Sequence, residues 1–448
     1  MKIIRFNQGL EIARSLLAGS EIVRTKGAES FVLLRDLYGR LRLLCPTLTS
    51  EEGVTLKTEW IEMLGSSTDV DRPILFDSDF FSPTEVRSNP LLQFLMLDDG
   101  PRKIPFADRG VIGADWTQSA FPESADAQGA QHPKRIVFFG LKGGVGRTTA
   151  LCLTARHFAK KGLKVLVLDM DLESPGLSSL LLSPAELPPL GIIDWFMEDG
   201  LGQASRDLLS EFVSSSSLAS NWPGVIRVAP AFGKDETGYI PKLSRVYADL
   251  VLQENSKQEG FPERFFRMLR ELEKAEKPDV VLLDSRAGMH DIAATLLVRL
   301  PDALRLLFAG HSPQTWTGYK HMFEHWRSFS SHLATFRDGL QVVDSMMPET
   351  GREEHRESFA AAAYSLFNET LYEDVPAGAD TGEIYNFQEV DSDAPHSGPS
   401  ILWDRKFMEF DPNDNSSSFH DEDLVRLCYG AFLTCIDERL QIEPPSPL

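Results

Sequence analysis

From residue 135 onward, the apolar residues fall into short continuous runs separated by segments of helical periodicity. Runs such as RIVFFG (residues 135–140), LKVLVLDMD (163–171) and DVVLLD (279–284) are typical of strands that are buried on both faces. Strands of this kind, alternating with helices, form parallel sheets that helices cover on both faces. The pattern therefore predicts an α/β domain over residues 135–448, with a mostly parallel sheet flanked by helices.

Residues that are typical of the starts and ends of helices locate other elements of this domain. Lys160 and Lys161 suit the last turn of a helix that begins at Thr148, and Pro262 suits the start of another helix. Leu427 belongs to the face of the final helix that we expect to pack on the sheet. The final helix and the remaining strands are predicted at Asp421–Leu440, Ala303–Ala309, Leu340–Val343 and Ser400–Trp403.

Residues 1–115 show a different pattern. Helical periodicity covers Gln8–Leu17 and Thr49–Gly65, and two apolar runs flank a turn at Tyr38 and Gly39. We expect a small α+β domain of unknown role. Residues 116–134, which are rich in Ser, Ala and Gln, are expected to form a linker. The acidic stretch at about 350–400, broken by Gly, Pro and Ser, is expected to be a long loop or lid.

The composition is that of a globular protein, with 448 residues of which 42% are hydrophobic and 25% charged. No run approaches the ~18 to 20 apolar residues of a membrane helix, and the first residues contain no apolar signal-peptide block. We therefore expect a cytoplasmic protein without a transmembrane segment. The four cysteines include no CxxC pair, which argues against a disulfide framework or a structural zinc site.

The net charge of −21 is unevenly distributed. Residues 351–448 carry 6 Lys and Arg against 21 Asp and Glu, a balance of −15. An acidic surface repels a phosphate backbone. The charge pattern therefore disfavours nonspecific DNA binding by this part of the chain.

A glycine-rich segment, LKGGVGRTTA (residues 141–150), separates the first strand of the α/β domain from its first helix. Such a turn lets main-chain N–H groups converge on phosphate oxygens at the positive end of the helix. Thr148 is placed to ligate Mg²⁺ through its hydroxyl, and Thr149 to reach the α-phosphate. The turn itself consists of Gly143, Gly144, Val145 and Gly146.

The segment KGGVGRTT resembles the deviant Walker A loop of the MinD/ParA family of P-loop ATPases, of the SIMIBI class. The resemblance continues in VLDMDLESPG and VVLLDSRAG and covers about residues 135–440. It implies an ATP- and Mg²⁺-dependent homodimer. Lys142 would reach across the dimer to the partner's phosphates, and Asp171 would orient the attacking water. The same segments also resemble a bacterial branch that often stands beside signalling or defence modules.

The resemblance also implies roles for the segment after the third buried strand, switch II. Asp284 would hold Mg²⁺ through a water, together with Thr148, and Gly288 would let the segment respond to the γ-phosphate. Arg286 has two possible partners, a phosphate or an acidic neighbour such as Asp291.

The base site is less defined by the sequence. Pro313, in a loop after a predicted strand, would contact the base in a protein of this family. The family's asparagine for adenine recognition is not evident, because Asp344 stands after LQVV. The choice between ATP and GTP stays open.

Arg147 stands where such loops usually carry a lysine that bridges the β- and γ-phosphates. A guanidinium keeps the charge, but it is longer and planar and bonds two oxygens at once. The replacement is compatible with an adapted site or with lost turnover. The sequence thus predicts an Mg²⁺-dependent ATP-binding, slowly hydrolysing dimerisation switch that regulates an unidentified protein partner. The alternative is a nucleotide-gated binding module with negligible hydrolysis, within a bacterial signalling or defence system.

Overall fold

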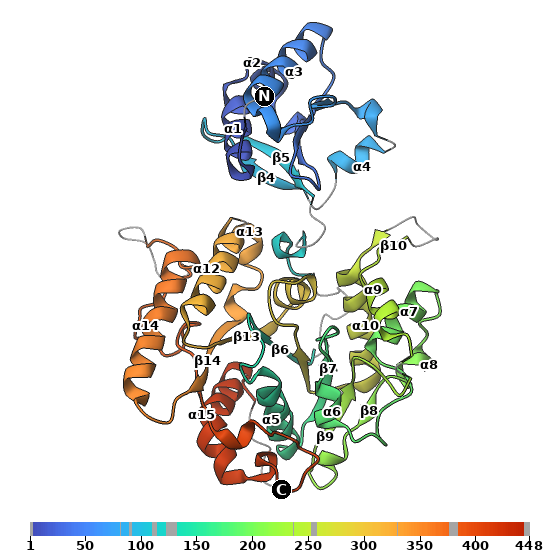
Figure 1. Ribbon diagram of the computed structural model, residues 1–448, viewed down its shortest axis with the longest axis vertical. Helices are drawn as coiled ribbons and strands as arrows, with labels where there is room; N and C mark the ends of the chain where they lie inside the picture. Colours follow the sequence, from blue (N-terminus) through green and yellow to red (C-terminus); the bar gives the residue numbers. More distant parts are fainter. Residues whose placement is uncertain are drawn as a thin grey trace. The chain divides into compact units, whose positions relative to one another are not determined.

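The computed structural model describes residues 3–80, 82–88, 92–109, 114–121, 132–235, 237–251, 258–328, 330–375 and 384–442. The chain divides into two compact units, Met1–Ala114 (unit 1) and Asp115–Leu448 (unit 2). In Figure 1, unit 1 is coloured from blue to cyan, and unit 2 continues from there to red.

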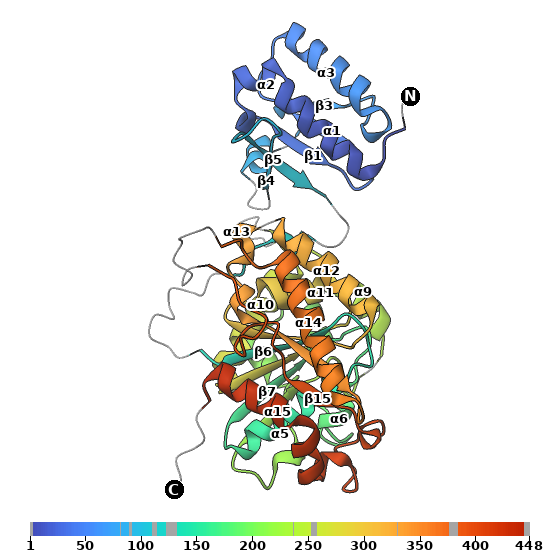
Figure 2. The same cartoon turned by 90° about the vertical axis from the view of Figure 1, so that its left-hand side faces the viewer.

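Unit 1 is a small α+β unit, as the sequence predicts. Its elements are α1 (Phe6–Gly19), α2 (Glu21–Lys26), β1 (Val32–Arg35), β2 (Leu41–Leu44), α3 (Ser50–Leu64), β3 (Ile74–Leu75), α4 (Pro83–Arg87), β4 (Gln93–Met96) and β5 (Lys103–Asp108). The strands form a sheet of order β3-β2-β1-β5-β4, in which β1 and β2 make the expected antiparallel hairpin. Figure 2 shows α1 and α3 side by side. Their buried residues Leu17 and Trp60 join Leu33 of β1 in one core.

Unit 2 contains a large sheet with helices between its strands (Figure 1). Its strands are β6 (Lys134–Gly140), β7 (Lys164–Asp169), β8 (Ser214–Ser215), β9 (Val225–Ala229), β10 (Leu250–Val251), β11 (Gln258–Glu259), β12 (Val280–Asp284), β13 (Ala303–Ala309), β14 (Leu340–Met347) and β15 (Ser400–Leu402). Its helices are α5 (Arg147–Lys160), α6 (Leu177–Leu181), α7 (Ile192–Gly200), α8 (Arg206–Leu209), α9 (Tyr239–Val246), α10 (Phe261–Glu276), α11 (Asp291–Ala294), α12 (Pro313–Arg327), α13 (Ser330–Leu333), α14 (Arg352–Thr370) and α15 (Glu422–Leu440).

The sheet of unit 2 has eight strands in the order β15-β14-β13-β6-β12-β7-β9-β8. Neighbouring strands pair in parallel, except β8, which is antiparallel to β9. The predicted mostly parallel sheet is confirmed. The chain passes from β6 to β7 on one side and later from β12 to β13 on the other. The carboxyl end of β6 is therefore a topological switch point, where open α/β sheets bind their ligands.

Helices cover both faces of this sheet. Ile136 and Phe138 of β6 point into a core shared with α5, α6 and α15. Val137 and Phe139 point the other way, into a core shared with α7, α10, α12 and α14. Because side chains alternate along a strand, a fully apolar strand needs a helical layer on each side. This explains why RIVFFG is apolar throughout.

The stretch 350–400 is not the long loop that its composition suggested. Residues 352–370 form α14, in which Phe359, Ala363 and Phe367 are buried. These positions recur every four residues and face the aromatic core, where Phe367 packs edge-on against Phe323 of α12. The acidic residues of this helix lie mostly on its exposed side, which hid the apolar face in the composition. Residues 376–383 of the predicted loop lie outside the described residues.

The first residues of the predicted linker pack on unit 2 instead of standing free. Trp116 is 8% exposed, with its ring centroid 6.1 Å from that of Trp326. Phe121 stacks on Phe266 at 4.8 Å. The aromatic residues, not the surrounding Ser and Ala, decide the structure here. Residues 122–131 of the linker lie outside the described residues.

The final helix buries a different face from the one we expected. Leu427 is 63% exposed, whereas Val425, Cys428 and Phe432 are buried. In the described part of the chain, no helix has the length and apolarity needed to cross a membrane. The four cysteines are free thiols.

Candidate functional site

The glycine-rich loop joins the carboxyl end of β6 to the first turn of α5. Gly144 and Gly146 have φ angles of 76° and 75°, in the left-handed region that glycine adopts without strain. A Cβ added to Gly143, Gly144 or Gly146 would meet no atom within 4 Å, so the loop's main chain borders open space. Val145 is half-buried and packs against the core, which holds the loop to the sheet. The loop has the shape of an anion cradle.

Arg147 is the centre of the site's charge. Its side chain is buried, and its Nε donates to Asp284 Oδ1 at 2.8 Å while Nη2 donates to Asp171 Oδ2 at 2.9 Å. The hydroxyl of Thr148 donates to Asp284 Oδ2, also at 2.8 Å. The fold therefore brings four predicted site residues together across 137 positions of sequence.

These contacts perturb the acid–base equilibria of the site. Burial raises the pKa of Asp284 and that of Asp171, although Arg147 opposes both shifts. Burial by itself lowers the pKa of Arg147, but Asp284 and Asp171 outweigh it and the net shift is upward. The guanidinium thus stays charged as the counter-ion of two carboxylates.

Asp169 is a site residue that the sequence did not reveal. It ends β7, is 0% exposed, and accepts the N–H of Asp171 at 3.2 Å. Burial, reinforced by the charges of Asp284 and Asp171, raises its pKa well above the ordinary value. The only signal in the sequence was a carboxylate at the end of an apolar strand, two residues before Asp171.

Several buried polar atoms of this cluster have no hydrogen-bond partner. They are Nη1 of Arg147, Oδ1 of Asp171 and Oδ2 of Asp169. A buried polar group without a partner costs about 1 to 3 kcal/mol, so unpaired groups mark a place where a ligand can bind. A donor and two acceptors beside an open glycine loop fit a metal-bound triphosphate. Among the described residues, no group of three or more His, Cys, Asp or Glu side chains could by itself hold a metal ion.

The two segments that follow β7 and β12 are tied together. Arg286 Nη1 lies 2.6 Å from Glu173 Oε1, an acidic neighbour that the sequence did not indicate. Gly288, with φ of 85°, donates its N–H to Gly140 O at 3.1 Å. His290 caps α11, where its Nδ1 accepts the N–H of Ile292 at 3.5 Å.

Lys142 and Pro313 lie at the edge of the site. Lys142 is exposed, and its Nζ donates to Gln314 Oε1 at 2.5 Å. Pro313 is the exposed first residue of α12, next to Gln314. Thr149 is half-buried in the first turn of α5. Its predicted contact with the α-phosphate stays a prediction, as does the contact of Pro313 with a base.

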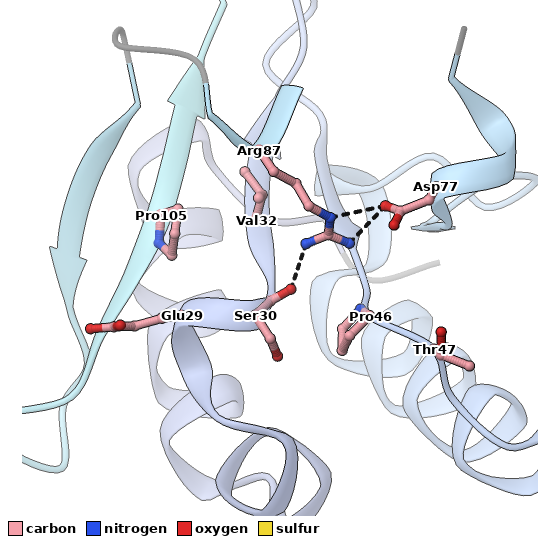
Figure 3. A pocket seen from close by; sticks show the side chains of 8 residues that line it. All are labelled: Glu29, Ser30, Val32, Pro46, Thr47, Asp77, Arg87 and Pro105. Carbon is pink, nitrogen blue, oxygen red and sulfur yellow. Dashed lines mark hydrogen bonds and ion pairs between the residues drawn. The ribbon is translucent and has the colours of Figure 1, made fainter. Parts of the chain in front are cut away.

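Unit 1 contains a cavity of about 350 Å³ between Val32, Pro46 and Pro105 (Figure 3). Its one cation, Arg87, donates to Asp77 Oδ1 at 2.9 Å, to Cys45 O at 2.8 Å and to Ser30 O at 2.5 Å. Because these bonds engage each nitrogen of the guanidinium, Arg87 holds unit 1 together. The cavity provides no further basis for a function.

A family comparison decides the class of unit 2. Residues 136–349 match the model of the CobQ/CobB/MinD/ParA nucleotide binding domain. This segment belongs to that family. The predicted relation to MinD and ParA is confirmed, and the matched segment includes Arg147, Asp171 and Asp284. The deviant form of the loop and the individual roles of its residues stay predictions.

Several solved structures are similar to this chain at low sequence identity. A ParA family ATPase from Chlorobium tepidum TLS is 14% identical, with 69% of this chain and 99% of that chain covered at a TM-score of 0.42. An ATP complex of a Cyanothece McdA variant is 16% identical, covering 70% and 98% at 0.43. The pNOB8 ParA bound to nonspecific DNA is 15% identical, covering 69% and 99% at 0.41. No curated protein matches the chain.

Proposed function

We propose that unit 2 binds ATP with Mg²⁺, hydrolyses it slowly, and acts in the cytoplasm as a dimerisation switch for an unidentified protein partner. One observation carries the proposal. Arg147 lies between Asp171 and Asp284 and keeps one nitrogen without a partner beside the open glycine loop. The chain's own cation thus balances the carboxylates of a metal–triphosphate site.

Nucleotide binding would redirect Arg147. The triphosphate brings negative charge to loop 141–146, and a guanidinium can donate two parallel hydrogen bonds to phosphate oxygens. The loop N–H groups and the N-terminus of α5 add fixed positive charge. When Arg147 turns to the phosphates, Asp171 and Asp284 lose their counter-ion and become available to other groups.

Each released group then has a task in hydrolysis. Bound Mg²⁺ would supply positive charge to the β- and γ-phosphate oxygens. Thr148 and Asp284, whose side chains already touch at 2.8 Å, would hold it. We assign Asp171 to the positioning of the attacking water. Catalysis of this kind consists mainly of positioning and electrostatic stabilisation.

Lys142 suits a role between two copies of the chain. It is exposed, and its described partner is the neutral Gln314 rather than a carboxylate of its own site. We assign it to the phosphates bound by the other copy of a homodimer. The Glu173–Arg286 ion pair joins the segments after β7 and β12, so we expect a change at Asp171 to reach Gly288.

The same guanidinium supports a second candidate function. If Arg147 keeps Asp171 paired after nucleotide binds, no carboxylate positions water, and unit 2 is a nucleotide-gated binding module with negligible hydrolysis. Either function suits a bacterial signalling or defence system. Single-turnover hydrolysis of ATP with Mg²⁺ separates the two candidates, because only the switch releases phosphate.

Calorimetry with Mg²⁺ and either ATP or GTP tests the proposal. We expect the native protein to bind ATP, Arg147→Ala to bind none, and Asp171→Ala to bind without hydrolysing and to accumulate as a dimer in light scattering. Lys142→Ala should bind but stay monomeric, while the matched control Lys57→Ala, at an exposed lysine of unit 1, behaves like the native protein. No uptake of either purine nucleotide at millimolar concentration would refute the proposal.

A further inference from the structure

Asp171 lies in a segment just beyond the end of β7. The N–H of Met170 still donates to Asp284 O of β12 at 3.0 Å. The N–H of Asp171 then donates to Asp169 Oδ1 at 3.2 Å, and the N–H of Ser174 donates to Asp171 O at 3.1 Å. Both of these bonds join close neighbours in sequence. A side chain that positions a reactant has to be held within about 0.5 Å, so this segment needs support from another element.

Two tyrosines of α9 provide that support. Tyr239, the first residue of the helix, donates its hydroxyl hydrogen to Leu172 O at 2.6 Å. Tyr247, directly after the last residue of the helix, donates to Glu173 Oε1. The two residues that follow Asp171 are therefore each bound by one hydroxyl group, and these groups come from the two ends of one helix.

Both hydroxyl groups are fixed as donors. Their acceptors, a carbonyl and a carboxylate, have no proton to give. Burial raises the pKa of both Tyr239 and Tyr247; the negative charge of Asp169 adds to the shift at Tyr239, and the bond to Glu173 adds to the shift at Tyr247. The two tyrosines therefore stay protonated at neutral pH, and their hydrogen bonds persist there.

The helix α9 is itself fastened to its neighbours, α7 and α10 (Figure 1). Lys242 Nζ donates to Asp194 Oδ1 of α7 at 2.7 Å. From α10, the buried Arg264 donates through Nη1 to Val246 O and to Ala248 O, both at 3.1 Å, at the carboxyl end of α9. These bonds connect α9 to the body of unit 2, so a hydroxyl group carried by α9 has a fixed position.

Glu173 shows what the bond from Tyr247 adds. Glu173 Oε1 is also paired with Arg286, and Glu173 Oε2 is buried without a hydrogen-bond partner. Arg286 lies in a segment that is outside the sheet as well, so its bond does not by itself fix Glu173. Tyr247 connects Glu173 to α9, and its ring packs against His290 with centroids 5.3 Å apart.

We propose that Tyr239 and Tyr247 are positioning residues that hold Asp171 where it directs the attacking water. This inference rests on the proposed function, because it concerns the placement of a side chain in the same hydrolytic site. The two hydroxyl groups bond Leu172 and Glu173, not the glycine loop that receives the phosphates. Hydrolysis therefore depends on them, whereas the affinity for Mg·ATP does not.

Single-turnover hydrolysis and calorimetry with Mg·ATP test this inference on the full chain. Tyr247→Phe removes the hydroxyl group and keeps the ring that packs against His290. We expect it to slow hydrolysis about tenfold, because a hydrogen bond that fixes Glu173 is lost, while the dissociation constant for Mg·ATP stays within about twofold of the native value. Tyr239→Phe should slow hydrolysis severalfold, likewise with native affinity.

Tyr385→Phe is the matched control. The hydroxyl group of Tyr385 donates to a main-chain oxygen of unit 2, Arg337 O at 3.0 Å, as that of Tyr239 does to Leu172 O. Denaturant unfolding should show a similar loss of stability for all three variants, but Tyr385→Phe should hydrolyse ATP at the native rate. A purely structural role predicts instead that all three variants slow hydrolysis equally or not at all.

Native hydrolysis rates in both Tyr239→Phe and Tyr247→Phe would overturn the inference. Equal slowing in Tyr385→Phe, or a loss of affinity as large as the loss of rate, would also overturn it. Each of these results leaves the proposed function intact. A native protein that binds Mg·ATP without releasing phosphate overturns the inference and the proposed hydrolysis together. A native protein that binds no Mg·ATP defeats the proposed function as a whole.

Discussion

Two buried arginines lie near opposite ends of β6 and bind carboxylates in different ways. Arg135, at the start of the strand and 1% exposed, makes a bidentate pair with Glu273 at 2.7 and 2.9 Å, and its third nitrogen donates to Pro301 O. Arg147, just beyond the end of the strand, divides its bonds between two carboxylates and keeps Nη1 without a partner.

This difference distinguishes an ion pair that only stabilises the fold from one that can also bind a ligand. A bidentate pair with every nitrogen engaged fixes α10 against the sheet and leaves nothing for a ligand. A pair with unfilled donors and acceptors is costly as structure, because each unpaired buried group is disfavoured. The unpaired groups of the Arg147 cluster lie at the carboxyl edge of the sheet, where the glycine loop borders open space.

The largest expected effect is the loss of stability when the Arg135–Glu273 pair is broken, because every guanidinium nitrogen of that pair is engaged. Arg135→Ala leaves Glu273 buried without a counter-ion, which should lower the free energy of unfolding by about 3 to 5 kcal/mol. Denaturant unfolding measures this. Arg147→Ala serves as the comparison and should cost less, because Arg147 lies beside the open glycine loop, from which water can enter the space that its side chain leaves. Equal losses would contradict the distinction between the two arginines.

Next in size is the effect of Arg147→Ala on binding. Loss of the charge-assisted hydrogen bonds to phosphate should weaken the binding of Mg·ATP by about 100-fold or more, so that calorimetry detects no binding. Arg147→Lys keeps the charge but loses the fork of donors, so it should retain part of the affinity. If Arg147→Ala bound ATP with native affinity, the guanidinium would have no role at the phosphates.

A smaller effect concerns Asp169. Because its pKa is raised in the folded protein, folding takes up a proton above the ordinary pKa of 3.8, and the native protein loses stability as pH rises through the raised value. Asp169→Asn should therefore raise the free energy of unfolding by about 1 to 3 kcal/mol at pH 8 and by little near pH 4. Thermal melts at both values check the sign. A gain that shrinks as pH rises would contradict it.

The smallest effect is expected at an exposed pair. Arg356 and Glu353 of α14 are 2.9 Å apart, but their side chains are 55% and 75% exposed. Solvent screens such pairs, so Glu353→Gln should leave the melting temperature within experimental error. A loss comparable to that of Arg135→Ala would show that distance alone, and not burial, determines the strength of these pairs.

Much of the fold could be predicted from the local pattern. The strands beginning at Ala303 and Ser400 start where the sequence placed them, and the final helix begins one residue after the predicted Asp421, which caps it. Such boundaries depend on neighbouring residues. The loop predicted where α14 forms and the linker predicted at Trp116 were wrong for one reason. In both segments, a few apolar side chains among polar residues pack into a core formed by distant parts of the chain. Composition averages over those residues, whereas packing depends on each of them.

The candidate site, too, could be predicted from the sequence only in part. The glycine loop and its threonines are contiguous, so the sequence alone indicated a phosphate cradle, and the family match agrees. Asp169 was missed because a carboxylate at the end of a strand has no local signature. The Glu173–Arg286 pair was missed because its members come from separate segments, one after β7 and one after β12.

The order of residues by itself determined the buried strands, the glycine loop and the class of nucleotide-binding domain, since each depends on residues that are neighbours in the chain. Only the tertiary structure decided the state of Arg147. Its two carboxylates are 24 and 137 positions away, and the parallel pairing of β6, β12 and β7 brings them within hydrogen-bonding distance. Burial then gives those bonds their strength, because water no longer competes for the same groups.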